Sequence, residues 1–275
     1  AKEQGNGLIN GNMLIVGGSG SGKSFMLKEM IQNFLLPENY QFIDKIYVIN
    51  YKASADYNFL QGLNKFEYAD DIPSGLRILK KVQLDMMTKY KYNSVHSEDN
   101  FTAYQTIVIL DEVQNLNETL ESKSLHKIMK ATVQESLSIL EMLGSKIRAS
   151  NGTLINVLQK ADVSSLPSTA YRSNLRNRIM LKQENVSSAH LVVNSDITEK
   201  NSVNPLELKQ GQYLYWDMLT NQLQEGFVIL TGNEANAKIL NELPMNSHVQ
   251  KVLNEVHSYK NVAIEAVSIF NNILE

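Results

Sequence analysis

Residues 13–24 read MLIVGGSGSGKS, and this stretch decides the fold. The apolar run Met13–Val16 has the composition of a buried strand, whereas residues 23–36 repeat apolar side chains at helical spacing until Pro37. Between them, Gly17–Ser24 fits the pattern G-x-x-x-x-G-K-[S/T]. The stretch therefore predicts a strand, a phosphate-binding loop and a helix in direct succession.

We expect this loop to hold the phosphates of a nucleotide. Glycines let the backbone wrap closely around an anion, and the helix that follows points the positive end of its dipole at that anion. The Lys23 side chain can then reach the outer phosphates, and the Ser24 hydroxyl can ligate Mg²⁺. We therefore predict ATP and Mg²⁺ as cofactors, bound by Gly17, Gly18, Ser19, Gly20, Ser21, Gly22, Lys23 and Ser24.

An acidic pair, Asp111 and Glu112, directly follows the apolar run Thr106–Leu110. A nucleotide site needs such an element at the end of a neighbouring strand. Asp111 is expected to hold Mg²⁺, usually through water, and Glu112 to orient and deprotonate the water that attacks the γ-phosphate. A simple molecular switch or a nucleoside kinase does not need the second carboxylate, so the pair favours hydrolysis that drives motion.

Further polar residues extend the candidate site. Gln159 follows the predicted strand 153–158, where its amide could contact the γ-phosphate or the attacking water. Arginines cluster as well, because four of the five in the chain lie between residues 148 and 178, while lysine is the usual cation elsewhere. This cluster indicates either a need for a planar, multidentate cation or a chance grouping on the surface. Its members are Arg148, Arg172, Arg176 and Arg178.

The remaining apolar runs predict an α/β protein. Strands at 46–49, 106–110 and 153–158 alternate with helices at 73–92 and 118–143, which indicates a mostly parallel central sheet with helices on both faces. After residue 178 we expect a short strand at 179–181, an antiparallel pair at 212–216 and 222–229, and helices at 234–243 and 247–273. The polar stretches 94–100 and 195–204 are predicted loops.

Composition narrows the class of protein. The 275 residues suffice for one large domain with appendages, and the net charge of −3 argues against a broadly basic surface that coats nucleic acid. No apolar run approaches the ~20 residues of a membrane-spanning helix, and the N-terminal residues lack a signal-peptide layout. The absence of cysteine excludes thiolate zinc sites, and the five histidines show no metal-ligand spacing. We expect a cytoplasmic protein whose only metal is nucleotide-bound Mg²⁺.

The order of these elements resembles the FtsK/SpoIIIE-type DNA translocases of the FtsK–HerA group of P-loop motors. The resemblance is carried by MLIVGGSGSGKS at 13–24, LRILKKVQLDMMTKYKY at 76–92, VILDEVQNL at 108–116, KIRASNGTLINVLQKADVSSLPSTAYRSNLRNRIML at 146–181, LKQGQYLYW at 208–216 and EGFVILTGNEANAKILNEL at 225–243. Two departures stand out. Asn50-Tyr51 replaces the usual Asp-Pro, and Lys160 follows Gln159 where an Arg-Pro pair is usual.

The resemblance implies a RecA-like motor in residues 1–243, followed by a C-terminal helical extension in 244–275. It implies translocation of double-stranded DNA, as in plasmid or element transfer, viral packaging or segregation, by a homo-oligomeric ring for which a hexamer is favoured. A membrane or a capsid portal would be a partner only through a part outside this chain. The alternative is a protein-secretion ATPase of the type VII kind, while a regulator without hydrolysis is disfavoured by Glu112.

In similar ring motors, ATP is hydrolysed at subunit interfaces, where an arginine of one subunit reaches the γ-phosphate of the next. The match to the family's arginines ranks Arg148 and Arg178 above Arg176 and Arg172, and the alternative is that these arginines only form ion pairs at the interface. The mixture of cations and aromatics at residues 89–92 indicates either DNA contact or an ordinary helix end. Residues 247–275 would either pack on their own domain or contact a neighbour.

Overall fold

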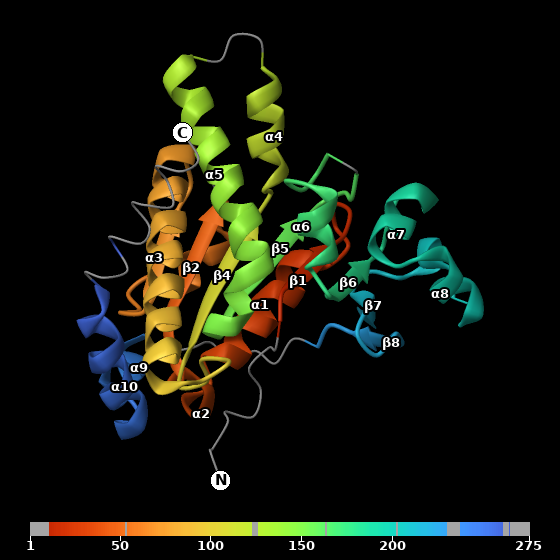
Figure 1. Cartoon of the computed structure of the whole chain (residues 1–275). Coiled ribbons are helices and arrows are strands. Elements are labelled where there is room, and N and C mark those ends of the chain that lie inside the picture. The colour runs from red at the N-terminus through yellow and green to blue at the C-terminus, as the bar shows by residue number, and fades with distance from the viewer. Residues whose placement is uncertain are drawn as a thin grey trace.

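The computed structural model describes residues 11–52, 54–122, 126–162, 164–201, 203–229, 237–260 and 264. Among them, eight strands form one sheet in the order β3-β2-β4-β5-β1-β6-β7-β8 (Figure 1). The six parallel strands are β1 (Met13–Val16), β2 (Ile43–Asn50), β3 (Phe66–Ala69), β4 (Gln105–Asp111), β5 (Gly152–Leu158) and β6 (Asn177–Leu181). β7 (Gln212–Asp217) and β8 (Gln222–Phe227) extend the sheet in antiparallel fashion. The predicted α/β class and the C-terminal antiparallel pair are thus confirmed.

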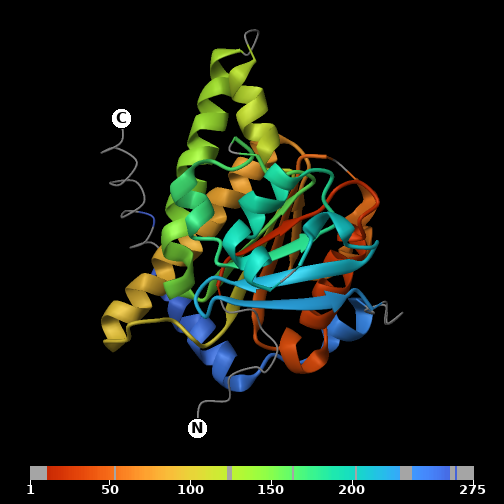
Figure 2. The ribbon, with the colours of Figure 1, turned by 90° about the vertical axis from the view of Figure 1, so that its right-hand side faces the viewer.

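Helices cover both faces of this sheet, as the two views in Figures 1 and 2 show. One face is covered chiefly by α3 (Ile72–His96) and α5 (Lys127–Lys146), together with α4 (Gln114–Glu121), α6 (Thr169–Ser173), α7 (Val186–Val192) and α8 (Ser195–Lys200). The other face is covered by α1 (Lys23–Phe34), α2 (Pro37–Tyr40) and α9 (Ala237–Glu242). α10 (Ser247–Ser258) lies against α3 at the edge of the molecule.

The apolar strands explain why two cores form. Side chains alternate between the faces of a strand, so Leu14 and Val16 enter the core beneath α3 and α5 while Met13 and Ile15 enter the core beneath α1. All four residues are at most 6% exposed. A strand that is buried on both faces must be apolar throughout, which is the pattern that identified it in the sequence.

Several elements differ from the sequence-based expectation. β3 was not predicted, because it has only four residues and one of them is exposed. The predicted loop at 195–204 contains α8, whose start is capped by Asn194, and α7 begins in the same way at Asn185. The predicted loop at 94–100 begins too early, since α3 continues to His96 and ends where Ser97 adopts a left-handed conformation. Local capping residues outweighed the polar composition of these stretches.

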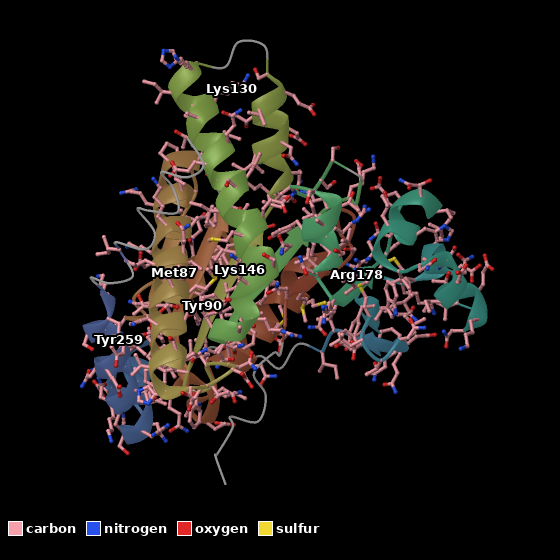
Figure 3. The ribbon with its side chains drawn as sticks, viewed as in Figure 1. Met87, Tyr90, Lys130, Lys146, Arg178 and Tyr259 are labelled. Atoms are coloured by element: carbon pink, nitrogen blue, oxygen red, sulfur yellow. The ribbon has the colours of Figure 1, made fainter. Side chains whose placement is uncertain are left out.

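The long helix predicted over 118–143 is two helices. α4 ends at Glu121, and Ser122 is extended; α5 begins after His126. The two helices form a hairpin that projects well beyond the edge of the sheet (Figure 2). Tyr90 of α3 points toward Lys146 at the opposite end of α5 and donates a hydrogen bond to its carbonyl (Figure 3). The hairpin is therefore anchored on the body of the protein at its base.

The described part of the predicted C-terminal helix packs on its own domain. Val249, Val252 and Val256 of α10 bury themselves against Tyr92 and Phe101, and Glu255 accepts a hydrogen bond from His96 at 2.6 Å. Residues 261–263 and 265–275 of the expected extension, like residues 234–236 of the expected preceding helix, lie outside the described residues. Within the described ranges, the helices are too short or too polar to cross a bilayer.

The stretch at residues 89–92, considered above for DNA contact, is placed differently. Lys89 is completely buried, with its ammonium 2.8 Å from Asp85 and 2.7 Å from the Thr106 hydroxyl. The same ammonium lies 4.5 Å from the centre of the Tyr104 ring. Of the two alternatives for this stretch, DNA contact is contradicted for Lys89, because its cation is enclosed between α3 and β4 by groups of its own chain.

The first prediction concerns this buried ion pair. Asp85→Ala is expected to lower the free energy of unfolding by about 3 kcal/mol, because it leaves a buried ammonium without its carboxylate. The matched control is Glu67→Ala, which breaks an exposed ion pair between Glu67 of β3 and Lys81, a residue of α3 like Asp85. This substitution should lower the free energy of unfolding by less than about 1 kcal/mol. Urea unfolding followed by circular dichroism measures both, and equal losses would contradict the account.

Candidate functional site

The carboxyl ends of neighbouring parallel strands bring the predicted site together. Val16 of β1 pairs with Leu158 of β5, and Asp111 of β4 pairs with Val157 of β5. The residues that follow these positions are the glycine-rich loop, Glu112 and Gln159. Three segments more than 40 residues apart in the sequence therefore meet at one edge of the sheet, as expected for ligand sites in open α/β sheets.

The loop at Gly17–Ser24 has the conformation of an anion cradle. Gly20 and Gly22 have φ angles of 70° and 100°, in the left-handed region that favours glycine. A Cβ atom on Gly17 would lie 2.4 Å from the Ser21 hydroxyl, so the turn is also too tight for a side chain there. No side chain caps the start of α1 at Gly22, which leaves the first N–H groups of the helix pointing toward the loop.

Lys23, the first residue of α1, folds back over this loop. Its ammonium donates a hydrogen bond to the Gly17 carbonyl at 3.3 Å and lies 3.9 Å from Oε1 of Glu112. Burial lowers the pKa of Lys23, while the charges of Glu112 and Asp111 act in the opposite direction. A cation held between the loop and the carboxylates can neutralise the outer phosphates of a nucleotide.

Asp111 and Ser24 provide the oxygen ligands that Mg²⁺ prefers. Both line one pocket, together with Lys23, Asp56 and Tyr57. Burial raises the pKa of Asp111 to about 6, the charge of Glu112 acts in the same direction, and a 3.0 Å hydrogen bond from the Tyr57 hydroxyl opposes the shift. Among the described residues, no group of three or more His, Cys, Asp or Glu side chains could hold a metal ion.

Glu112 is held in an unusual backbone conformation. Its φ of 59° lies in the left-handed region, which costs a non-glycine residue about 1–3 kcal/mol. Its N–H donates a hydrogen bond to the Val157 carbonyl at 3.0 Å, and only 4% of the residue is exposed. Strain of this kind persists only where the surrounding structure maintains it, and it concentrates at functional sites. The conformation turns the carboxylate toward Lys23.

Gln159 lies beside this group without a direct contact to Glu112 among the described interactions. It is half-buried and lines a cavity of about 260 Å³ together with Gln114 and Asn117 of α4. The amide of Gln114 in turn donates a hydrogen bond to Oε2 of Glu112. Gln159 therefore lines the same cavity as the residue that contacts the Glu112 carboxylate.

The sequence reading missed three residues of this site: Asp56, Tyr57 and Gln114. Asp56 and Tyr57 lie in a 3₁₀ helix, Ala55–Leu60, that follows β2, and Asp56 accepts a hydrogen bond from the Ser24 hydroxyl at 3.5 Å. The one usable signal was position, because β2 is the parallel neighbour of β4 and the segment after it must lie near Asp111. Gln114 gave no signal beyond its closeness to the acidic pair.

The four arginines that cluster in the sequence lie at different sites in the structure. Arg148 is exposed, and with Arg176 it lines a cavity of about 120 Å³ at the opposite end of the sheet, beside Gly11 and Asn12. Both residues are therefore remote from the phosphate loop of their own chain. Arg172 lies in α6 and offers its carbonyl to Arg178.

Arg178 is placed differently from the expectation that ranked it as a finger. It is a buried residue of β6 (Figure 3). Its guanidinium donates hydrogen bonds to the carbonyls of Leu175, Leu191, Val192 and Arg172 at 3.0–3.3 Å. It also stacks over Trp216. Burial lowers the pKa of Arg178 to about 10. These contacts commit the side chain to joining β6 to the end of α7, so it is not free to reach a neighbour.

Solved structures share this fold. The conjugation coupling protein TcpA of pCW3, in its monomer form with ATPγS, has a TM-score of 0.69 at 14% identity over 85% of this chain and 65% of TcpA. The type VII secretion ATPase EccC of Thermomonospora curvata (cytoplasmic domain) has a TM-score of 0.62 at 13% identity over 86% and 29% of the two chains. The genome packaging NTPase B204 of Sulfolobus turreted icosahedral virus 2, in complex with sulfate, has a TM-score of 0.50 at 16% identity. This match covers 81% of this chain and 99% of B204.

At these sequence identities, the structural likeness shows that the fold is shared and nothing more. The chain spans less than two thirds of the length of TcpA and of EccC. No curated protein matches the sequence. The family model of the FtsK/SpoIIIE family matches residues 2–145, more than half of the chain, and this range includes the phosphate loop and both carboxylates. The chain therefore belongs to the FtsK/SpoIIIE family.

Proposed function

We propose that this protein is an ATP-driven motor that moves double-stranded DNA and hydrolyses ATP between the subunits of a ring. The observation that carries the proposal is the meeting of Lys23, Asp111 and Glu112 at one sheet edge. Family membership supports it, as does the fold shared with a conjugation coupling protein and a viral genome packaging NTPase. Within this proposal, residues 1–243 form the motor and 244–275 a helical extension.

The geometry supports a separate role for each group of site residues. The loop amides and Lys23 would bind the phosphates, and Ser24 with Asp111 would hold Mg²⁺, which when bound neutralises charge on the β- and γ-phosphates. Glu112 presents Oε1 toward Lys23, at the outer end of the phosphate cradle. There the carboxylate would accept the proton of the attacking water as its oxygen bonds to the γ-phosphorus and the ADP oxygen leaves.

The arginine surface supports hydrolysis between subunits. Arg148 and Arg176 lie at the sheet end opposite their own phosphate loop, so only a neighbouring subunit could place its nucleotide against them. A guanidinium there would spread charge over the γ-phosphate oxygens in the transition state. Because Arg178 is committed to its own chain, we now place Arg148 first as the trans residue and Arg176 second.

Protein secretion is the second candidate function, supported by the fold shared with the type VII ATPase EccC. The two functions differ in what stimulates hydrolysis. A DNA motor grips the phosphate backbone, which needs local cations and no broadly basic surface, in agreement with the net charge of −3. A secretion motor would instead respond to a secreted polypeptide.

The second prediction separates binding from chemistry. Lys23→Ala should weaken ATP binding by about 100-fold or more, because a lost charge-assisted contact costs about 3 kcal/mol. Glu112→Gln should keep ATP binding and lose turnover by about 10²–10⁴-fold, since it preserves shape and removes the base. Fluorescent-nucleotide titration and phosphate release measure the two effects. Wild-type turnover in Glu112→Gln would refute the base assignment.

The third prediction concerns the transported polymer. Double-stranded DNA of any sequence should stimulate ATPase activity, and the DNA affinity should fall linearly on a log–log plot against salt, because the expected contacts are to phosphates. ATPase assays at several salt concentrations, with a set of unrelated DNA duplexes, test this. Stimulation by a secreted peptide and never by DNA would transfer the assignment to protein secretion.

The fourth prediction concerns the trans arginine. An Arg148→Ala subunit keeps its phosphate loop and a Lys23→Ala subunit keeps its arginines, so mixed rings should regain ATPase activity that neither variant has alone. Electron micrographs must first show that both variants form rings. The matched control is Arg77→Ala, an exposed arginine on α3 outside the cluster, which should retain activity without mixing. If no mixing ratio restores activity, Arg148 does not act in trans.

A further inference from the structure

The two oxygens of the Glu112 carboxylate face different partners. Oε1 lies 3.9 Å from the Lys23 ammonium, at the outer end of the phosphate cradle. Oε2 accepts a hydrogen bond from Nε2 of Gln114, the first residue of α4. The carboxylate is therefore oriented from behind by a neutral amide, while its other oxygen remains directed toward the position of the chemistry.

We propose that Gln114 is a positioning residue, which fixes the rotation of the Glu112 carboxylate so that Oε1 points at the attacking water. This inference rests on the proposed function, in which Glu112 is the base. A carboxylate has a broad terminal torsion and does not hold one orientation by itself. A donor on one oxygen fixes this torsion, and a displacement of about 1 Å at a reacting group can cost about 100-fold in rate.

The backbone around Glu112 creates this contact. Glu112 is left-handed and Val113 is right-handed helical, so the chain reverses and α4 begins at the next residue. Two backbone hydrogen bonds close the turn, from the Asn115 N–H to the Glu112 carbonyl and from the Leu116 N–H to the Val113 carbonyl, both at 3.1 Å. The turn brings the side chain at position 114 back alongside the carboxylate two residues earlier.

Two further contacts hold α4 in place. Leu116 is completely buried in the core beneath the helix. The Asn117 amide donates hydrogen bonds to the carbonyls of Ser164, at 2.8 Å, and Leu166, at 3.2 Å. These two carbonyls belong to the segment that follows Gln159. Gln114 is thus carried on a helix anchored both to the core and to the segment beside the site.

The other end of the Gln114 amide has no partner within the described structure. Its Oε1 is buried without a hydrogen bond, and leaving a buried acceptor unsatisfied is unfavourable. Gln114 and Gln159 line the same cavity. Donors on the wall of that cavity, among them Gln159, are the groups from which this oxygen could accept a hydrogen bond.

The experiment replaces the amide in the 275-residue chain. Gln114→Met keeps the length of the side chain and removes the donor, and Gln114→Glu keeps its shape and replaces the donor by a carboxylate. Both should lower kcat by about 10- to 100-fold and leave the affinity for a non-hydrolysable ATP analogue within about twofold of wild type. Adding Gln114→Met to Glu112→Gln should cause no further loss, because no carboxylate is left to position.

The matched control is Thr119→Val, which keeps the side-chain shape on the same helix, removes only the hydrogen bond from the Thr119 hydroxyl to the Asn115 carbonyl, and should leave kcat within about twofold of wild type. The proposal is overturned if Gln114→Met has wild-type kcat while Glu112→Gln is inactive, or if Thr119→Val reproduces the loss. It is also overturned if the losses in the double variant are additive. Wild-type turnover in Glu112→Gln would instead remove the base assignment itself and, with it, the role of Gln114.

Discussion

The hydrogen-bond register between β1, β5 and β4 is the constraint on which the rest of the structure depends. It sets Val16 opposite Leu158 and Asp111 opposite Val157, so the three strands end level with one another. The glycine loop, the acidic pair and Gln159 consequently meet at one edge of the sheet, where the ion pair between Lys23 and Glu112 joins the loop to the acidic pair. The backbone hydrogen bonds from Gly17 to Leu158 and from Glu112 to Val157 continue this register into the site.

The same edge concentrates charge in a nearly dry environment. Asp111 and Glu112 are at most 7% exposed, and Lys23 is the cation that faces them. Burial raises the pKa of Asp111 and lowers that of Lys23, so both groups lose part of their preference for the charged form. A ligand with its own negative charge and a divalent cation would complement these groups. The electrostatics of the edge thus agree with a magnesium–nucleotide complex, as do the oxygen ligands.

The sequence predicted the parts of the site that lie in short, continuous stretches. Residues 13–24 and Asp111-Glu112 can each be recognised from a few consecutive positions, because an apolar strand and the residues at its end are adjacent in the chain. Asp56, Tyr57 and Gln114 could not be predicted in this way, since their roles arise from contacts made after folding. The attachment of Arg178 to its own chain could not be predicted for the same reason, because only the structure shows the four carbonyls that accept its hydrogen bonds. The burial of Lys89 could likewise not be predicted, because the groups around its ammonium come together only in the fold.

In the proposed mechanism, one sheet edge brings the loop, the cation and the base to the γ-phosphate. A crystal structure of the protein with Mg²⁺, ADP and aluminium fluoride tests this most directly, because the fluoride mimics the transferred phosphoryl group in its transition state. We expect the Lys23 ammonium to have left the Gly17 carbonyl for the fluoride, and a water in line with it to lie within hydrogen-bond distance of Glu112 Oε1. A nucleotide bound at this loop with Glu112 turned away, and the water held by another residue, would contradict the account.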